Sequence, residues 1–215
     1  MKFQPIHLGQ SILKYQVPYD IFRTINVIYE AYLKKLPKAN KHLIGKIKNE
    51  HSLFYSRDDR DVKKHNFLTK EVYEWFKYIF LHYLTYNKIV YHTINIDSIW
   101  INEMKEYEYN PAHVHRGNLS TGLSSVLVLK LPSTYGKEYS REDSLTNGKL
   151  QLFGSSSGQF AKVDYEPEMK VGDFYVFPYD MRHCVYPFNE TNETRRTLAA
   201  NCDVDYSRIQ STGVK

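Results

Sequence analysis

Three of the nine histidines are placed where they could bind one metal ion. His113 and His115 are separated by one residue, and in a strand this spacing puts both side chains on the same face. His183 begins a later candidate strand that could face the first one. Two neighbouring ligands and one distant ligand can form a facial triad, which leaves coordination positions open for other ligands. The alternative is a surface strand that carries two histidines and binds no metal.

A second group of residues with chemical potential lies in the segment RRTLAANCDVD, which begins at Arg195. In a strand, Arg196 lies on one face, and the opposite face carries Arg195, Thr197, Ala199 and Asn201. An inward arginine can bind a carboxylate through two parallel hydrogen bonds, and Thr197 can add another. We select Arg195 over Arg196 because it shares its face with Thr197. The alternative for Arg195 is an ion pair at the surface.

The elements that position these residues are predicted to be strands. After Asn87 the chain consists of short runs rich in Val, Ile, Tyr and Phe, which turn residues separate. Such a series fits a jelly roll, or double-stranded β-helix, better than an open sheet. A long polar segment, Ser133 to Gly148, interrupts the series, and loops of this length often form lids or binding loops. The predicted strands are Ile89–Ile96, Ile99–Asn102, Ala112–Arg116, Leu123–Leu131, Lys149–Phe153, Phe174–Phe177, Cys184–Tyr186 and Arg195–Val204.

The first part of the chain is predicted to be mainly helical. Apolar residues recur with helical spacing from Ile21 onward, and Asp20 is the expected N-cap. A second apolar stripe runs from Val72 to Leu84, with Thr69 as its expected N-cap. Both stripes indicate packing against a sheet rather than ligand binding.

Length and composition agree with one enclosed catalytic unit. The 215 residues are 42% hydrophobic and 25% charged, which is enough to bury a core around a site. We expect an α+β fold in which a mainly helical region, residues 1–88, packs on the sheet of a double-stranded β-helix core, residues 89–215, as one structural unit. Only two cysteines and no long apolar run occur, which predicts a cytoplasmic protein without membrane contact. Nothing in the sequence predicts the oligomeric state.

Several short motifs occur in a specific order between Trp100 and Asn201. They are Trp100-Ile101-Asn102, Asn110-Pro111-Ala112-His113-Val114-His115, Leu119-Ser120-Thr121-Gly122, Gly172-Asp173, Phe177-Pro178, His183 and Arg195-Arg196-Thr197, with Asn201 at the end. In this order they resemble a bacterial and phage family of 2-oxoglutarate/Fe(II)-dependent oxygenases related to prolyl 4-hydroxylase. The resemblance covers about half of the chain, and the order of the motifs is more specific than any one of them.

The resemblance implies a dioxygenase that hydroxylates an unidentified substrate and converts 2-oxoglutarate and O₂ to succinate and CO₂. It implies that Fe(II) is held by His113, His115 and His183, and that Arg195 and Thr197 anchor the distal carboxylate of 2-oxoglutarate. Neutral polar groups expected to line the co-substrate pocket are Asn102, Asn110 and Tyr109, for which ordinary turn and strand-end hydrogen bonding is the alternative. A phage-encoded protein of this kind would act in the host cytoplasm.

Two departures from the family pattern affect these expectations. Most such enzymes have an acidic ligand at the position of His115, so His115 ranks below His113 and His183, and it could lie behind the metal while water completes the coordination. Three neutral histidines still suit Fe(II), because dianionic 2-oxoglutarate would balance its charge. The segment SSVLVLKLP also lacks a tyrosine expected before Pro132, so no role of that tyrosine is carried over.

Two other functions remain open at this point. One is a cupin-like dioxygenase that uses three histidines without 2-oxoglutarate, which His115 favours and the Arg195 and Thr197 pair disfavours. The other is a non-enzymatic jelly-roll module that binds a partner. The substrate could be a peptide, a nucleic acid or a small molecule, and the net charge of +5 favours an anionic partner only slightly.

Overall fold

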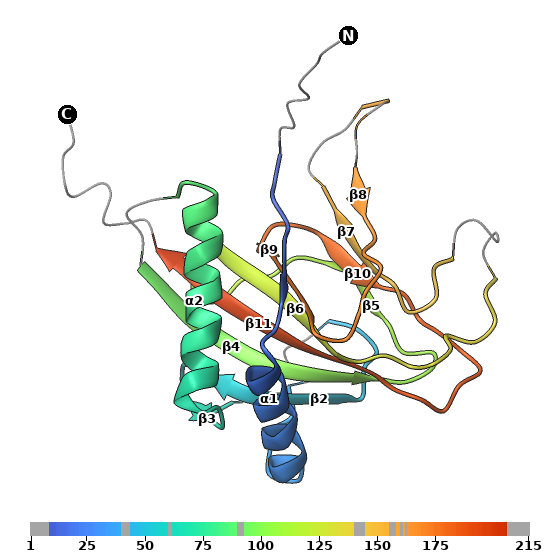
Figure 1. Ribbon diagram of the computed structural model, residues 1–215, viewed down its shortest axis with the longest axis horizontal. Helices are drawn as coiled ribbons and strands as arrows, with labels where there is room; N and C mark the ends of the chain where they lie inside the picture. The colour runs from blue at the N-terminus through green and yellow to red at the C-terminus, as the bar shows by residue number, and fades with distance from the viewer. Residues whose placement is uncertain are drawn as a thin grey trace.

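The computed structural model describes residues 9–39, 44–59, 62–89, 93–139, 145–154, 158–159, 161 and 163–205. These residues form two facing antiparallel sheets, and two helices cover the outer face of the larger sheet (Figure 1). The larger sheet has the order β1-β9-β6-β11-β4-β2-β3, and the smaller sheet has the order β5-β10-β7-β8. This arrangement is the predicted jelly roll.

The bounds of the elements, in chain order, are β1 Leu13–Gln16, α1 Tyr19–Tyr32, β2 Asn49–Tyr55, β3 His65–Asn66, α2 Lys70–Tyr86, β4 Thr93–Met104, β5 Asn110–His113, β6 Gly122–Lys130, β7 Leu150–Phe153, β8 Asp164–Tyr165, β9 Asp173–Pro178, β10 His183–Val185 and β11 Arg195–Asp205.

The two helices bury the apolar stripes that the sequence predicts. The Thr69 side chain caps α2 by accepting a hydrogen bond from the Val72 amide at 3.3 Å, as expected. The expected cap of α1 was wrong, because Pro18 occupies the N-cap position and Asp20 lies in the first turn. Proline suits this boundary because its ring fixes φ, here at −60°. Its carbonyl oxygen accepts from the Phe22 amide at 2.9 Å.

Two predicted strands are one continuous strand in the structure. Ile99–Asn102 and the described end of Ile89–Ile96 both belong to β4, whereas residues 90–92 lie outside the described residues. Asn201 pairs with Ser98 and Cys202 with Ile96, so Asp97 is an extra residue on β4. A bulge therefore replaces the turn that we expected there.

The larger sheet contains three strands from the region that we expected to be helical. β1, β2 and β3 all precede residue 89. β1 pairs with β9, and β2 pairs with both β4 and β3. β2 has the sequence NEHSLFY, in which buried Glu50, His51 and Ser52 hide the polar and apolar alternation that identifies a strand. The short strand β8 was also missed. Among the described residues, no helix is both long and apolar enough to cross a membrane.

The fold brings the predicted site to the space between the sheets. β11 lies between β4 and β6 near the centre of the larger sheet, and β10 lies between β5 and β7 in the smaller one. The polar segment Ser133–Gly148 leaves from the end of the sandwich, and its residues 140–144 are outside the described part. Its base is held by Asn189, which accepts from the Lys137 amide at 2.8 Å and donates to the Lys137 carbonyl at 2.9 Å.

Candidate active site

Three histidine side chains converge between the sheets. β5 and β10 are antiparallel neighbours, and His183 lies directly opposite His113. β5 ends at His113, so His115 does not share the predicted strand, although its amide donates to the Tyr179 carbonyl at 2.9 Å. The possible ligand atoms of the three histidines lie within 4.8 Å of one another. The structure thus places all three predicted ligands around one point.

Backbone carbonyls orient two of these histidines. The Nδ1 of His113 lies 2.7 Å from the Pro111 carbonyl oxygen, and the Nδ1 of His183 lies 3.0 Å from the Met181 carbonyl oxygen. A carbonyl oxygen only accepts, so each Nδ1 carries the proton and each Nε2 is available to a metal ion. Burial and the nearby His113 lower the pKa of His183 to about 4. Burial also lowers the pKa values of His113 and His115, so neutral imidazoles prevail near pH 7.

A narrow cavity, here called the inner cavity, lies behind the histidines and measures about 30 Å³. Arg195 and Thr197 line it from β11, and Asn102 lines it from β4. Arg195 is 2% exposed, and its Nε has no hydrogen-bond partner among the described residues. Burial lowers the pKa of Arg195, and the nearby Tyr135 side chain opposes this effect.

The two adjacent arginines lie on opposite faces, as their parity predicts. Arg196 forms ion pairs with Glu103 at 2.7 Å and Glu30 at 2.8 Å. For Arg195, the described residues provide no such carboxylate, and its Nη2 contacts the Met169 sulfur at 3.4 Å. A buried cation without a counter-ion is strongly unfavourable, so this geometry suits a bound anion.

The inner cavity also contains buried acceptors without partners. The Oδ1 atoms of Asn102 and Asn110 make no hydrogen bond with any residue that the structure describes. Tyr109, by contrast, is 41% exposed and does not line the inner cavity. The sequence analysis missed Tyr135 and Met169, which both lie beside Arg195. The only sequence signal was for Tyr135, which lies in the long polar segment Ser133–Gly148. Loops of this length often form lids or binding loops.

The inner cavity is smaller than a five-carbon dicarboxylate, so 2-oxoglutarate needs side chains to move. Met169 is suited to do so because methionine is flexible and its sulfur is a weak hydrogen-bond acceptor. A carboxylate would replace this contact with charge-assisted hydrogen bonds, which are considerably stronger. The residues present therefore fit the keto acid once Met169 moves aside.

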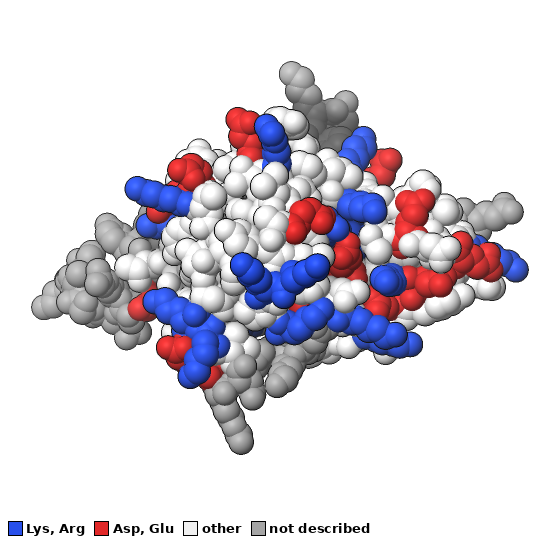
Figure 2. Space-filling model, turned by 90° about the horizontal axis from the view of Figure 1, so that it is seen from below, with Lys and Arg blue, Asp and Glu red and all other residues white. Residues whose placement is uncertain are grey.

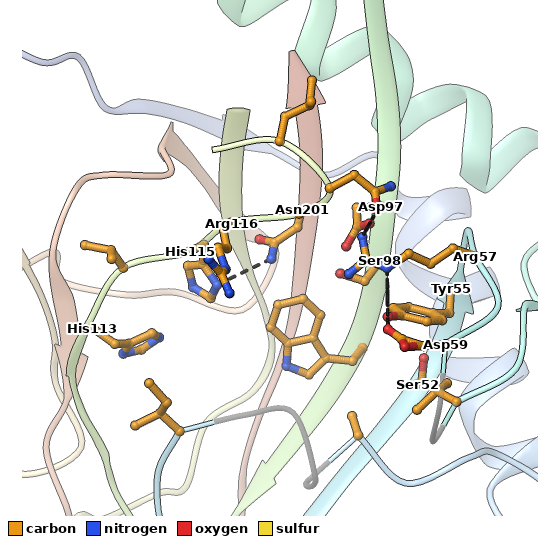
Figure 3. A pocket seen from close by; sticks show the side chains of 18 of the residues that line it. Ser52, Tyr55, Arg57, Asp59, Asp97, Ser98, His113, His115, Arg116 and Asn201 are labelled. Carbon is orange, nitrogen blue, oxygen red and sulfur yellow. Dashed lines mark hydrogen bonds and ion pairs between the residues drawn. The ribbon is translucent and has the colours of Figure 1, made fainter. Parts of the chain in front are cut away.

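A second, larger cavity, here called the outer cavity, opens on the other side of the histidines and measures about 860 Å³. His113 and His115 form one wall of it. These two histidines line both cavities, as do Trp100 and Asn110. Figure 3 shows Tyr55, Arg57, Asp59 and Asp97 across the space from these histidines.

Arg57 closes the far wall of the outer cavity. Its Nη1 donates to Asp97 Oδ1 at 2.5 Å and to Asn118 Oδ1 at 2.6 Å, and its Nε donates to the Tyr55 hydroxyl at 3.0 Å. Asp97 is the extra residue of the β4 bulge, so the bulge turns its carboxylate toward Arg57. Asp59 also lies within ion-pair distance of Arg57, at 3.6 Å. Hydrogen bonds and ion pairs among these residues therefore stabilise the far wall.

Residues 98–201 match the model of a protein family described as "Putative 2OG-Fe(II) oxygenase". This part of the chain, just under half of it, is similar to the 2OG-Fe(II) oxygenase family. The matched residues include the three histidines, Arg195 and Thr197. The family match and the three-histidine cluster indicate an Fe(II)- and 2-oxoglutarate-dependent oxygenase, with O₂ as the other co-substrate. No curated protein matches the chain.

Solved structures support the fold of this oxygenase. A prolyl-4-hydroxylase from Pseudomonas putida has a TM-score of 0.56 at 14% identity, over 91% of this chain and 92% of that one. A 2OG-Fe(II) oxygenase family oxidoreductase from Burkholderia pseudomallei has a TM-score of 0.55 at 13% identity, over 91% and 84%. A prolyl hydroxylase from Trichoplax adhaerens, in complex with a hypoxia inducible factor peptide fragment, has a TM-score of 0.55 at 10% identity, over 96% and 88%.

Proposed function

We propose that this oxygenase binds Fe(II) through His113, His115 and His183, binds 2-oxoglutarate in the inner cavity, and hydroxylates a substrate held in the outer cavity. The observation that carries the proposal is the buried guanidinium of Arg195, which lacks a carboxylate partner in the described part of the protein. A cupin-like dioxygenase without 2-oxoglutarate has no use for that group. The family match also favours a 2-oxoglutarate enzyme over a binding module.

The charges of the site suit this pair of ligands. Three neutral imidazoles leave the full double charge on Fe(II), and the dianion of 2-oxoglutarate would neutralise it. Arg195 would bind the distal carboxylate bidentately, and the Thr197 hydroxyl would donate to the same group. The bound iron supplies the oxidising chemistry, whereas the protein orients the co-substrate and excludes water.

Asn102 and Asn110 are proposed to contact the co-substrate through their amides. Each has an Oδ1 without a hydrogen-bond partner, and rotation of either amide by half a turn would point its NH₂ group into the cavity instead. Tyr109 remains only a sequence-based hypothesis, because its side chain lies outside both cavities.

The outer cavity is the proposed substrate site. Its walls combine residues before position 88, such as Lys38 and Arg57, with residues of the β-helix core, such as His115 and Asn201. This shared lining supports the proposal that residues 1–88 and 89–215 act as one structural unit. A location in the cytoplasm is also proposed, since Cys184 and Cys202 are free thiols.

A peptide is the first substrate class to test, because two of the similar structures are named prolyl hydroxylases and one of them contains a peptide. Nucleic acid is a weaker candidate. Figure 2 shows acidic side chains among the basic ones, most densely toward one end of the face, so the excess of positive charge forms no purely basic surface there. A small molecule would also fit the volume of the outer cavity.

The experiment that tests the proposal is an anaerobic titration of Fe(II)-loaded protein with 2-oxoglutarate. Chelation of iron by the keto acid gives a weak visible charge-transfer band, which we expect for the wild-type protein. Arg195→Ala should weaken 2-oxoglutarate binding by about 100-fold or more, because truncation leaves a buried carboxylate unpaired.

Arg196→Ala is the matched control, since Arg196 pairs with Glu103 and Glu30 on the opposite face. It should leave the band and its midpoint unchanged. Iron binding without a band would replace this proposal with the cupin-like enzyme. Absence of iron binding would replace it with the non-enzymatic module.

A further inference from the structure

His115 lies outside any strand, so its position depends on the segment that follows β5. β5 ends at His113, and residues 114–121, here called the His115 segment, belong to no helix or strand. The ring of His115 nevertheless reaches the other site residues. Its Nε2 lies 3.1 Å from the Nε2 of His183, and its Nδ1 lies 3.4 Å from Asn201 Nδ2, a contact that Figure 3 marks. Contacts other than strand pairing must therefore hold this segment in place.

Backbone hydrogen bonds fix the two ends of the His115 segment. Near its start, the His115 amide donates to the Tyr179 carbonyl at 2.9 Å, and at its end the Thr121 carbonyl accepts from the Val204 amide at 3.0 Å. Between these points the side chains of residues 116 and 118–120 are exposed, so packing contributes little there. The middle of the segment needs an anchor of another kind.

The buried carboxylate of Asp203, on β11, is that anchor. Its Oδ2 accepts from the Asn118 amide at 3.0 Å, and its Oδ1 accepts from the Tyr179 hydroxyl at 3.2 Å. Burial raises the pKa of Asp203, and the backbone amides of Leu119 and Asn118 oppose this effect. Tyr179 is also the residue whose carbonyl accepts from the His115 amide. Asp203 therefore contacts the supports of the segment on both sides of His115.

Gly117 shows how closely the His115 segment approaches this carboxylate. A Cβ atom at position 117 would lie 2.1 Å from Asp203 Oδ1, whereas real Cβ contacts are essentially never shorter than 3.0 Å. The φ of Gly117 lies outside the left-handed region, so other residues could adopt its backbone conformation. Space, and not conformation, therefore requires glycine here, because the backbone rests against Asp203.

Asp203 differs from the other buried carboxylate near the outer cavity. Asp97 pairs with Arg57, whereas Asp203 forms no ion pair with any residue that the structure describes. Burial of a carboxylate is costly unless hydrogen bonds satisfy it, and here neutral donors of the His115 segment and of Tyr179 do so. Asp203 also lines neither cavity and lies just beyond residues 98–201, which match the family model.

We infer that Asp203 is a positioning residue that places His115 at the metal centre. It holds the backbone at Asn118 and the side chain of Tyr179, and these two contacts replace the strand pairing that ends at His113. Asp203 contacts neither the metal ion nor the substrate and acts only through His115. The inference rests on the proposed three-histidine site.

The first test is a double-mutant cycle on Zn(II) affinity, measured by competition with a coloured chelator. Asp203→Ala should weaken Zn(II) binding by about 10- to 100-fold, the usual effect of losing a group that orients a ligand. His115→Ala should weaken it at least as much. Because Asp203 acts through His115, the double variant should bind Zn(II) no more weakly than His115→Ala alone. Additive losses would overturn the inference, since they would mean that Asp203 acts on the whole protein.

Asp173→Ala is the matched control. Asp173 is also buried, and it likewise accepts from a backbone amide, that of Lys170 at 2.8 Å, and from a tyrosine hydroxyl, that of Tyr175 at 3.0 Å. It lines neither cavity, so its loss should lower stability and leave Zn(II) affinity unchanged. X-ray absorption spectroscopy counts the bound imidazoles, and we expect three in this control and two in Asp203→Ala. Three imidazoles in Asp203→Ala would contradict the inference.

Gly117→Ala tests the close approach to Asp203 from the other side. In the wild-type background, the added methyl group must push the His115 segment away from Asp203, so Zn(II) affinity should fall. In the Asp203→Ala background the space is free, and the same substitution should change affinity by less than about twofold. Equal effects in the two backgrounds would mean that Asp203 does not fix the position of the segment.

These results separate the inference from the proposed function. If the wild-type protein binds no metal, the proposed function fails, and amide hydrogen exchange in the metal-free protein still tests the anchor. Asp203→Ala should then speed the exchange of the His115 and Asn118 amides, and Asp173→Ala should not, whereas unchanged exchange would refute the anchor. If the keto acid band appears while the losses of Zn(II) affinity are additive, the oxygenase stands and the role of Asp203 is refuted.

Discussion

The inner and outer cavities meet at the histidines, but their charged groups differ in how they are satisfied. In the inner cavity, Arg195 Nε and the Oδ1 atoms of Asn102 and Asn110 have no hydrogen-bond partners within the described part of the chain. In the outer cavity, Arg57 is bound by Asp97, and Lys38 donates to His51 Nε2 at 2.8 Å. Buried polar groups without partners indicate a ligand, whereas groups that pair with each other stabilise the fold.

This difference explains why the co-substrate can be inferred and the substrate cannot. The inner cavity presents an arginine, a hydroxyl and two amides, which together specify a small dicarboxylate beside a metal. The outer cavity presents charges that the protein itself largely neutralises, together with apolar side chains such as Trp100 and Val114. Such a surface accepts several substrate classes. Each prediction below tests whether the two cavities are as separate as their contacts indicate.

The largest effect is expected from His183→Ala, because this histidine lines the inner cavity and is the most buried of the three. Loss of a ligand must exceed the 10- to 100-fold effect of losing a ligand's supporting group, so metal affinity should fall by more than about 100-fold. Anaerobic calorimetry with Mn(II) measures this effect. His82→Ala, which changes a histidine on α2 outside the cluster, is the control and should bind Mn(II) normally. A normal Mn(II) affinity of His183→Ala would exclude it as a ligand.

The second prediction concerns Glu50, which pairs in register with Asn102 at the wall of the inner cavity. Burial, with the nearby Glu108, raises the pKa of Glu50 from 4.5 to about 7. The folded protein thus binds the proton more tightly than the unfolded chain, so stability is lost as the pH rises from about 4.5 to about 7. A shift of this size corresponds to about 3 kcal/mol.

Glu50→Gln cannot ionise and should avoid that loss. Urea unfolding at pH 5 and pH 8 should show that the free energy of unfolding of the wild type falls more steeply than that of Glu50→Gln. Parallel behaviour of the two proteins would mean that Glu50 is ionised in the folded state. An ionised carboxylate beside Asn102 would oppose the negative charge of the co-substrate, so this result would weaken the inner cavity as an anion site.

The third prediction concerns the far wall of the outer cavity. Arg57→Ala leaves buried Asp97 without its cation, which should destabilise the protein by about 2 kcal/mol because Arg57 is itself partly exposed. The affinity for 2-oxoglutarate should change by less than about threefold, since Arg57 does not line the inner cavity. Chemical denaturation and the keto acid band measure the two effects. A large loss of 2-oxoglutarate affinity without destabilisation would show that the cavities are coupled.

The sequence predicted which candidate site residues lie together better than it predicted the strands around them. Arg195 and Thr197 could be assigned to one face because residue parity in a strand fixes side-chain direction. The run NEHSLFY could not be recognised as β2, because Glu50, His51 and Ser52 are buried through contacts with distant parts of the chain. The bulge at Asp97 was equally hidden, since it depends on the register between β4 and β11.

The convergence of the histidines was predicted for a partly incorrect reason. We expected His113 and His115 to share one strand, but β5 ends at His113, and His115 is held by its amide contact with Tyr179. Its contacts with Asn201 and His183 depend on three segments that only the tertiary structure brings together. The same applies to Met169, which has no motif and reaches Arg195 from a loop.

The smallest expected effect comes from Met169, whose sulfur contacts the Arg195 guanidinium where a carboxylate would bind. Met169→Ala removes this competitor and should tighten 2-oxoglutarate binding by about threefold, because a thioether sulfur is only a weak hydrogen-bond acceptor and its loss changes little free energy. Met169→Leu keeps most of the volume and loses the sulfur, so an equal gain would assign the effect to the sulfur contact. A gain in Met169→Ala alone would assign it to volume. Weaker binding in both variants would mean that Met169 shapes the inner cavity for the co-substrate instead of competing with it.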